Sequence, residues 1–366
     1  MLVISEIPTP YRLPLYARLA ERPDLELELV FCALDEPDRP WQVEEALAGV
    51  PHRILRGVAP ALRTRRNTFV YQVNPGAIDL LARSHYDVVV AGGYAVFAEQ
   101  AAIALARARG IPYVLHSEST LAKHRSALLR VAKRGVVGPI VRGAAAGLAV
   151  GSGAARYLAH YGMDPGRIRI VPNTIDVVGY GRDAAAARAR AEDVRAHWDL
   201  PERYVLFAGR LVEDKGIRDL VGALRLLGAD APALVVAGEG PLADEFGGVD
   251  GVRRVGFVQR DQLVELLALA AWTIVPSRVE PWGVIVNEAL ASGSPVIVTD
   301  AVGAAEDLVV DGINGRVVPA SSPQALAAAL AGPKPSGDPA EGRIARWTYD
   351  FAVDQFADAI RLALRG

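Results

Sequence analysis

The chain has almost none of the residues that cross-link small proteins or hold metal ions. Its 366 residues include one cysteine, Cys32, and six histidines that show no metal-ligand spacing. A single thiol excludes an internal disulfide, and no Cys or His pattern predicts a metal site. Cys32 lies in an apolar run typical of a strand, so we interpret it as a small core residue in a reducing compartment.

Long apolar runs are also missing. No uncharged run approaches the roughly 18 residues that a membrane span needs. Met1 is followed at once by a strand-like LVIS and then by Glu6, which does not resemble a signal peptide. With 51% apolar and 22% charged residues, the composition is that of a soluble globular protein. We therefore expect a cytoplasmic protein, and the length suggests about two domains.

Several large enzyme classes have motifs that this chain lacks. There is no G-x-S-x-G and no P-loop, which leaves serine hydrolase and NTPase functions without support. The turn Gly238-Glu239-Gly240-Pro241 follows an apolar strand and opens a helix. It has neither a third glycine nor a downstream acid at the spacing of a dinucleotide site, so it does not predict NAD binding.

Acidic residues are unevenly distributed along the chain. Residues 1–173 hold 21 Lys and Arg against 15 Asp and Glu, whereas residues 174–366 hold 19 against 27. No acid occurs between Glu118 and Asp164, or between Glu45 and Asp79. The first of these stretches contains Arg130, Lys133 and Arg134 among apolar residues, as in a basic amphipathic helix. We expect this half to meet anionic partners more readily.

The chain instead shows strand and helix patterns that alternate through both halves. This alternation predicts two α/β units with doubly wound parallel sheets. We place a linker at Val171–Thr174, which gives domains at 1–173 and 174–346 and a final amphipathic helix in 347–366. Residues 51–78 are expected to be irregular and basic. Residues 120–135 show helical spacing.

The stretch from Glu280 to Asp300 combines two carboxylates with a strand-end, turn, helix, strand pattern. Such a unit places Glu280 at the carboxyl edge of a sheet, where ligands of α/β folds bind, with Glu288 about one turn into the helix. The amides of Trp282, Gly283 and Val284 would be donors at a helix N-terminus, suited to anionic or hydroxyl-rich ligands.

A second pattern places two cations around a turn. Gly209 lets the backbone turn at a strand end, and Arg210 and Lys215 follow it before a helix begins. Fixed cations at such an edge can stabilise a charged leaving group without a metal ion.

Together these motifs resemble the donor site of family-4 glycosyltransferases, which are retaining enzymes of the GT-B fold. The matching features are Glu, seven residues and Glu with the flanking E-P-W-G and E-A-L-A-S-G-S-P-V, and G-R-L-x-x-x-K-G. The resemblance implies two Rossmann-like domains facing across a cleft, with the last helix crossing back to the first domain. It also implies that Glu280 contacts the donor sugar, Glu288 the ribose, and Arg210 and Lys215 the pyrophosphate.

Other site assignments depend more heavily on the resemblance. It places Gly238 and Gly240 below the nucleotide, although a plain tight turn explains them equally well. It places the backbone of Phe257 and Val258 at the base. His116 ends a strand, either near the reacting carbon or as a satisfied polar residue.

The loop after the first strand departs from the family's Gly-Gly pattern. It reads Glu6-Ile7-Pro8-Thr9-Pro10-Tyr11-Arg12, in which two prolines stiffen the backbone. This departure puts the family's usual contact from that loop in doubt. We assign Tyr11 and Arg12 to the acceptor or membrane side, together with Arg130, Lys133 and Arg134.

The resulting expectation is a metal-independent, retaining hexosyltransferase. Its co-substrate would be a UDP- or GDP-hexose, with no cofactor and no nucleic acid partner. The acceptor hydroxyl would belong to a lipid-linked molecule at an anionic membrane, with the enzyme peripheral on the inner face of the plasma membrane. The alternatives are a soluble acceptor, a GT-B sugar-nucleotide epimerase, a phosphorylase and a non-catalytic nucleotide-sugar-binding subunit.

Overall fold

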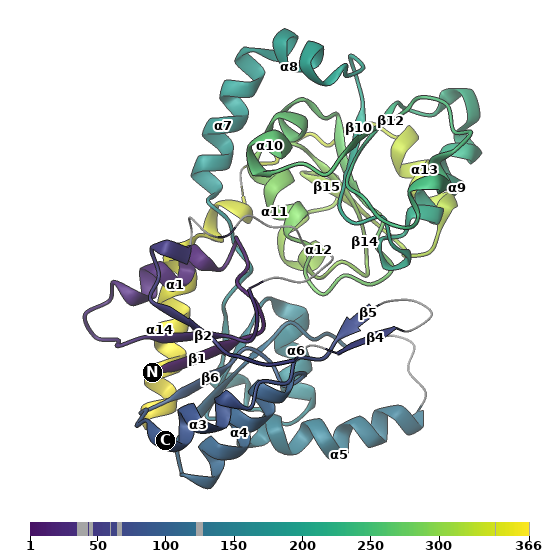
Figure 1. Ribbon diagram of the computed structural model, residues 1–366. Helices are drawn as coiled ribbons and strands as arrows, with labels where there is room; N and C mark the ends of the chain where they lie inside the picture. Colours follow the sequence, from purple (N-terminus) through teal and green to yellow (C-terminus); the bar gives the residue numbers. More distant parts are fainter. Residues whose placement is uncertain are drawn as a thin grey trace. The chain divides into compact units, whose positions relative to one another are not determined.

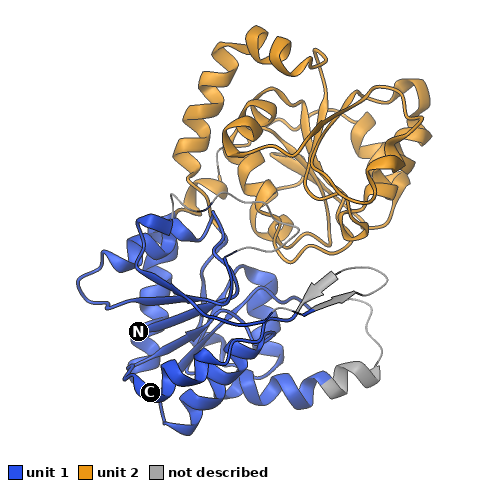
Figure 2. Ribbon diagram, in the orientation of Figure 1, with its two compact units in different colours: residues 1–173, 349–366 blue, residues 174–348 orange. Residues whose placement is uncertain are grey.

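The computed structural model describes residues 1–34, 43, 47–58, 60–63, 68–121, 127–340 and 342–365, without the side chains of 61–63, 68–70 and 127–132. The chain divides into two compact units (Figure 2). The first comprises Met1–Asn173 and Tyr349–Gly366, and the second comprises Thr174–Thr348. The chain therefore passes from the first unit to the second and returns.

A seven-stranded parallel sheet forms the centre of the first unit, in the order β3-β2-β1-β6-β7-β8-β9. Its strands are short and mostly buried, as expected where helices cover both faces. They are β1 (Leu2–Ser5), β2 (Glu28–Phe31), β3 (His52–Ile54), β6 (Val89–Ala91), β7 (Tyr113–Ser117), β8 (Ala146–Ala149) and β9 (Ile168–Ile170). A separate antiparallel pair joins β4 (Ala61–Arg63) to β5 (Thr68–Val70).

Helices cover this sheet on both sides (Figure 1). Helix α1 (Leu13–Ala20) and helix α14 (Tyr349–Arg365) share one apolar core with the sheet, to which Phe356 and Ile360 contribute. On the other face lie α4 (Phe97–Ala108), α3 (Gly76–Arg83) beside it, and α6 (Ser152–His160), whose Leu158 packs on Gly147. The unit also contains α5 (Ala127–Gly143) and the 3-10 turn η1 (Pro165–Arg167).

The second unit has its own parallel sheet of six strands, in the order β12-β11-β10-β13-β14-β15. These strands are β10 (Val205–Ala208), β11 (Leu234–Ala237), β12 (Val252–Gly256), β13 (Trp272–Val275), β14 (Val296–Thr299) and β15 (Gly315–Val318). The residues of β10, β11, β13 and β14 are almost all buried, which explains why they read as continuous apolar runs in the sequence.

Helices α9 (Ile217–Leu227) and α13 (Pro323–Ala331) contact each other on one face of this sheet (Figure 1). The other face carries α7 (Val177–Ala189), α10 (Arg260–Leu269), α11 (Val284–Ala291) and α12 (Gly303–Leu308). The remaining elements are α8 (Ala191–Trp198), η2 (Glu213–Lys215), η3 (Gly228–Asp230), η4 (Ala243–Phe246) and η5 (Ile344–Arg346). A doubly wound α/β arrangement is thus confirmed for each half.

Three sequence expectations are wrong in detail. Residues 51–78 contain β3, β4, β5 and the start of α3, because strands of three residues are too short to show a period. The helix expected at 120–135 runs from Ala127 to Gly143, past Pro139, while 122–126 and most of the polar stretch 34–50 lie outside the described residues. The final helix begins at Tyr349, so Trp347 lies outside it and belongs to the second unit.

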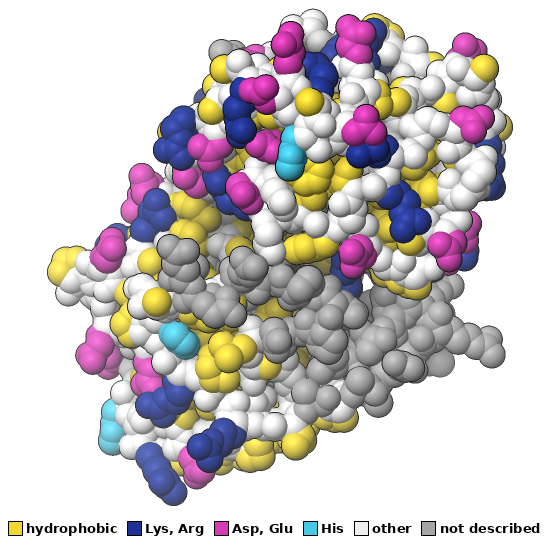
Figure 3. Space-filling view, turned by 45° about the horizontal axis from the view of Figure 1, so that its top comes forward, with side chains coloured by type: hydrophobic (Ala, Val, Ile, Leu, Met, Phe, Trp, Pro, Cys, Tyr) yellow, Lys and Arg dark blue, Asp and Glu magenta, His cyan; other side chains and the backbone are white. Residues whose placement is uncertain are grey.

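The charges of the second unit are mixed on the face shown in Figure 3, where acidic and basic side chains lie interspersed. Several charges of this unit form pairs, such as Arg190 with Glu265 and Arg253 with Asp199. Across the part of the chain that the structure describes, no helix combines the length and apolar character needed to cross a membrane.

Candidate functional site

The second unit has a point at which the strand order reverses. From β10 the chain moves outward through β11 and β12, and from β13 it moves in the other direction through β14 and β15. Ligands of open α/β sheets bind at such a point, at the carboxyl ends of the strands. The turn that follows β10 carries Gly209, Arg210 and Lys215, and the turn that follows β13 carries Glu280.

The turn after β10 packs backbone against backbone on its neighbour. Gly209 has φ +153°, and its amide donates to the carbonyl of Ala237 at 2.9 Å. Gly216 ends the turn with φ +70°, and a β-carbon there would overlap the carbonyl oxygen of Pro276. Glycine is therefore required at position 216 both by the left-handed backbone and by the close approach of the segment after β13.

The structure brings the two predicted motifs together through an ion pair. Lys215 Nζ donates to a carboxylate oxygen of Glu280, and the two side chains are 22% and 12% exposed. Arg210 is exposed at the same strand end. The cation and the carboxylate assigned to pyrophosphate and sugar thus lie side by side.

The loop that carries Glu280 is fixed from below by α12. Gly303 donates its amide to the Glu280 carbonyl at 3.0 Å, and Ala304 donates to the Trp282 carbonyl at 2.9 Å. Gly283 has φ +93° and immediately precedes α11, which Val284 begins. The Trp282 side chain is buried, stacks on Trp347 with ring centroids 5.0 Å apart, and donates to Asn287 at 3.0 Å.

Glu288 is partly buried on α11, and a tyrosine holds it. Tyr180 of α7 donates its hydroxyl proton to Glu288 Oε1 at 2.8 Å, and the Arg260 guanidinium lies over the Tyr180 ring at 4.4 Å. Burial raises the pKa of Glu288, whereas the Tyr180 hydrogen bond and the Arg260 charge lower it. The sequence analysis missed Tyr180, since no local pattern connects it to a carboxylate 108 positions away.

The glycine turn after β11 has a structural explanation. A β-carbon on Gly238 would overlap the carbonyl oxygen of Gly209, and one on Gly240 would lie 2.6 Å from the Leu211 carbonyl oxygen. Both positions are thus required by the neighbouring turn, whatever they bind. Gly238 also donates to Gly256 at 2.7 Å, which brings Phe257, 41% exposed, and the partly buried Val258 to the same edge.

The corresponding edge of the first unit holds His116 in a buried, uncharged form. His116 lies in β7 and is 7% exposed. Burial and the nearby Arg12 charge lower the pKa of His116 to about 3. The imidazole is therefore neutral at physiological pH and acts only through hydrogen bonds. Arg12 itself donates to Asn173 at 3.0 Å and pairs with Glu118, so its charge is compensated within the unit.

A buried carboxyl group, Glu99, lies close to the same edge. It is 1% exposed at the start of α4, where Ala95 donates its amide at 3.0 Å. Burial and the charge of Glu6 raise the pKa of Glu99 to about 8. A β-carbon at Gly93 would lie 2.9 Å from this carboxyl, so Gly92-Gly93 closes directly over it. The only sequence sign of Glu99 was an acid among the apolar residues of a helix.

The residues predicted for the acceptor or membrane side have different surroundings in the structure. Tyr11 is partly buried, and its carbonyl accepts from the Tyr349 hydroxyl at 3.1 Å. Lys133 Nζ lies 4.8 Å from the centre of the Tyr157 ring, and Arg134 is exposed. The side chain of Arg130 is among those that the structure does not describe.

Comparisons with known proteins identify the family to which the chain is similar. Residues 16–178 match the family model described as Glycosyltransferase Family 4, and residues 190–332 match Glycosyl transferases group 1. A D-inositol 3-phosphate glycosyltransferase of Pseudarthrobacter chlorophenolicus is 31% identical over 316 residues, which is 78% of this chain and 70% of the relative. The solved structure of Anabaena HepE with UDP superposes with a TM-score of 0.73 at 17% identity, covering 98% of this chain and 99% of that one.

Two other relatives are matched over less of their own length. An uncharacterized glycosyltransferase of Methanocaldococcus jannaschii is 35% identical over 134 residues, 34% of each chain. A D-inositol 3-phosphate glycosyltransferase of Geodermatophilus obscurus is 31% identical over 293 residues, 71% of this chain and 60% of that protein. The chain thus spans less than two thirds of these two relatives. It belongs to the family-4 glycosyltransferases of the GT-B fold.

Proposed function

We propose that the protein is a retaining glycosyltransferase that moves a hexose from a nucleotide-diphosphate sugar to an acceptor hydroxyl. The observation that carries the proposal is the pairing of Lys215 with Glu280 at the point of strand reversal in the second unit. Lys215 and Arg210 would stabilise the charge that develops on the diphosphate as the glycosidic bond breaks. Glu280 would accept hydrogen bonds from the sugar hydroxyls, and Glu288 from the ribose.

Retention would follow from attack on the face that the diphosphate leaves. The acceptor oxygen forms a bond to the anomeric carbon, the bond to the diphosphate oxygen breaks, and the departing phosphate takes the acceptor's proton. No side chain has to act as a base in this route. Because two fixed cations balance the diphosphate, activity should survive EDTA.

The test is a panel of radiolabelled UDP-, GDP- and ADP-hexoses, incubated with the protein with and without a lipid extract. Labelled product from one donor, with the donor's anomeric configuration, supports the proposal. UDP-hexose is the first choice, since HepE was solved with UDP. Interconversion of the nucleotide sugar without any acceptor would favour the epimerase alternative. Release of no product from any donor would refute catalysis.

For the acceptor we propose a lipid-linked hydroxyl at an anionic membrane. Its support is that Val136 on α5 is 68% exposed two positions after the exposed Arg134, and that Leu121 is 45% exposed in the same acid-free stretch. Each basic residue near such a surface contributes about 1 kcal/mol. Co-sedimentation with anionic vesicles should fall with salt and weaken when Arg130, Lys133 and Arg134 become Glu. No sedimentation at low salt would favour a soluble acceptor, as in the inositol phosphate relatives.

A further inference from the structure

Two short segments carry the proposed donor contacts, and neither contact residue lies in a strand or an α-helix. Lys215 ends the 3-10 turn η2, and Glu280 lies in the irregular segment between β13 and α11. The two segments bond to each other through the backbone. Arg278 and Val279 both donate amides to the Asp214 carbonyl, at 2.8 and 3.2 Å. The spacing between Lys215 and Glu280 is therefore set where residues 214 and 278 meet.

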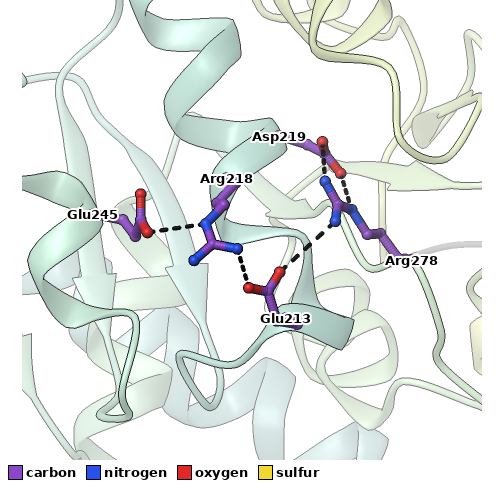
Figure 4. A network of polar contacts seen from close by, with 5 residues as sticks. All are labelled: Glu213, Arg218, Asp219, Glu245 and Arg278. Carbon is purple, nitrogen blue, oxygen red and sulfur yellow. Dashed lines mark hydrogen bonds and ion pairs between the residues drawn. The ribbon is translucent and has the colours of Figure 1, made fainter. Parts of the chain in front are cut away.

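A layer of charged side chains fastens this junction (Figure 4). The Arg278 guanidinium donates two parallel hydrogen bonds to Asp219, Nε to Oδ2 at 2.6 Å and Nη2 to Oδ1 at 2.7 Å. Asp219 lies on the first turn of α9 and is 4% exposed, so the carboxylate of this pair is buried. Arg278 Nη1 also lies 3.8 Å from Glu213 Oε2, on the turn that carries Lys215.

The outer part of the network continues from Glu213. Arg218 donates to Glu213 and, through Nε, to Glu245 Oε1 at 2.9 Å. Charges therefore alternate from Asp219 to Glu245 and connect the turns after β10, β11 and β13 (Figure 4). Arg218 is about half exposed, whereas the Arg278–Asp219 contact has one fully buried partner and a two-point geometry. Such a forked contact fixes direction as well as distance, which a Lys ammonium cannot reproduce.

We propose that Arg278 and Asp219 form a positioning pair for the donor site, which holds Lys215 at the distance from Glu280 that transfer requires. This inference rests on the proposed function. Neither residue needs to touch the donor, since Arg278 acts through the Asp214 carbonyl and through Glu213. A small displacement of a charged group costs more in the transition state than in the bound ground state. The pair should therefore affect turnover more than nucleoside diphosphate binding.

The experiment compares Arg278→Lys and Asp219→Asn with the wild type and with Arg225→Lys, a control on the exposed face of the same helix. Turnover of the donor identified from the sugar panel is measured, and UDP or the matching nucleoside diphosphate is titrated by calorimetry. We expect kcat to fall about tenfold or more in both variants. Nucleotide affinity should stay within about threefold, at an unchanged stoichiometry, and the control should keep wild-type kcat.

Two outcomes separate positioning from simple loss of structure. If the variants merely unfold, the calorimetric stoichiometry falls in proportion to kcat, and the inference is overturned. If Arg278 acts through Lys215, Arg278→Lys should cause no further loss of kcat in a Lys215→Ala background. Independent, multiplying losses would overturn the inference too.

The proposed function can be tested separately from the pair. An active wild type with normal kcat in Arg278→Lys and Asp219→Asn overturns the positioning pair alone. A wild type that turns over no nucleotide sugar overturns the proposed function and the inference with it.

Discussion

The two sheet edges of this molecule are built on different principles. In the second unit, the residues at the point of strand reversal are charged, partly exposed and carried on glycine turns that contact each other through their backbones. In the first unit, the corresponding edge holds a neutral histidine, a carboxyl of raised pKa and an arginine whose charge is already compensated. Each edge thus carries an ion pair, but the second adds the exposed Arg210, which suits it to binding an anionic ligand, whereas the first adds the neutral His116 and the buried Glu99.

This difference also explains which parts of the site the sequence could predict. Gly216 and Gly238 are forced by backbone contacts between adjacent turns, and Gly209 is favoured by its φ of +153°, so they leave a fixed local pattern together with Arg210 and Lys215. The supporting pairs leave no such pattern. Tyr180 meets Glu288, and Arg278 meets Asp219, only after separate βα units have packed.

The strands and helices also differ in whether a local sequence pattern identifies them. Strands such as β11 and β14 are buried on both faces, so their apolar runs identified them directly. The three-residue strands β3, β4 and β5 carry too few residues to show alternation, so the sequence does not distinguish them from irregular segments. An acid on the buried face of a helix, as at Asp219 and Glu99, is the one local sign that could have indicated a hidden polar contact.

The largest effect should come from filling the backbone contact between two turns of the second unit. Gly238→Ala forces a β-carbon into the Gly209 carbonyl at φ +143°, so we expect a loss of about 3 kcal/mol in unfolding free energy. Gly248→Ala is the matched control, with φ +72° and open space around it, and should cost about 1 kcal/mol. Equal losses in the two variants, measured by denaturant unfolding, would show that this contact is not tight.

Next in size is removal of either cation of the second edge. Lys215→Ala and Arg210→Ala should each lower turnover about 100-fold, because preorganised charges act most strongly on the transition state. Circular dichroism would check that the fold is retained. Near-normal turnover in both folded variants would show that the second edge does not act through its cations.

A smaller effect is expected at the ribose side. Glu288→Ala should weaken nucleoside diphosphate binding about tenfold by calorimetry, and Tyr180→Phe, which removes one hydrogen bond, about fivefold. In Tyr180→Phe the pKa of Glu288 should rise further. As the pH is lowered, Glu288 should therefore take up its proton, and nucleotide affinity should begin to fall, at a higher pH than in the wild type. An unchanged pH profile would separate Tyr180 from the site.

The smallest effect concerns the first edge and changes with pH. Glu99 has a folded pKa of about 8 against 4.5 in the unfolded chain, so the unfolded state loses its proton first and stability falls as pH rises from about 5 to 8. Glu99→Gln cannot ionise and should escape that loss. Its stability relative to the wild type should improve by on the order of 1 kcal/mol between pH 5 and pH 6. A pH-independent difference in melting temperature would mean that Glu99 is ionised in the fold.

The central claim is that the second unit presents a nucleoside diphosphate site built on Lys215 and Glu280. Calorimetric titration of the wild type and Lys215→Ala with UDP and GDP, in the presence of EDTA, tests it most directly. The account predicts that one nucleotide binds the wild type with a stoichiometry of about one per chain, and that Lys215→Ala binds it measurably more weakly. The claim would be contradicted if neither UDP nor GDP bound the wild type, or if the wild type and Lys215→Ala bound the nucleotide with equal affinity.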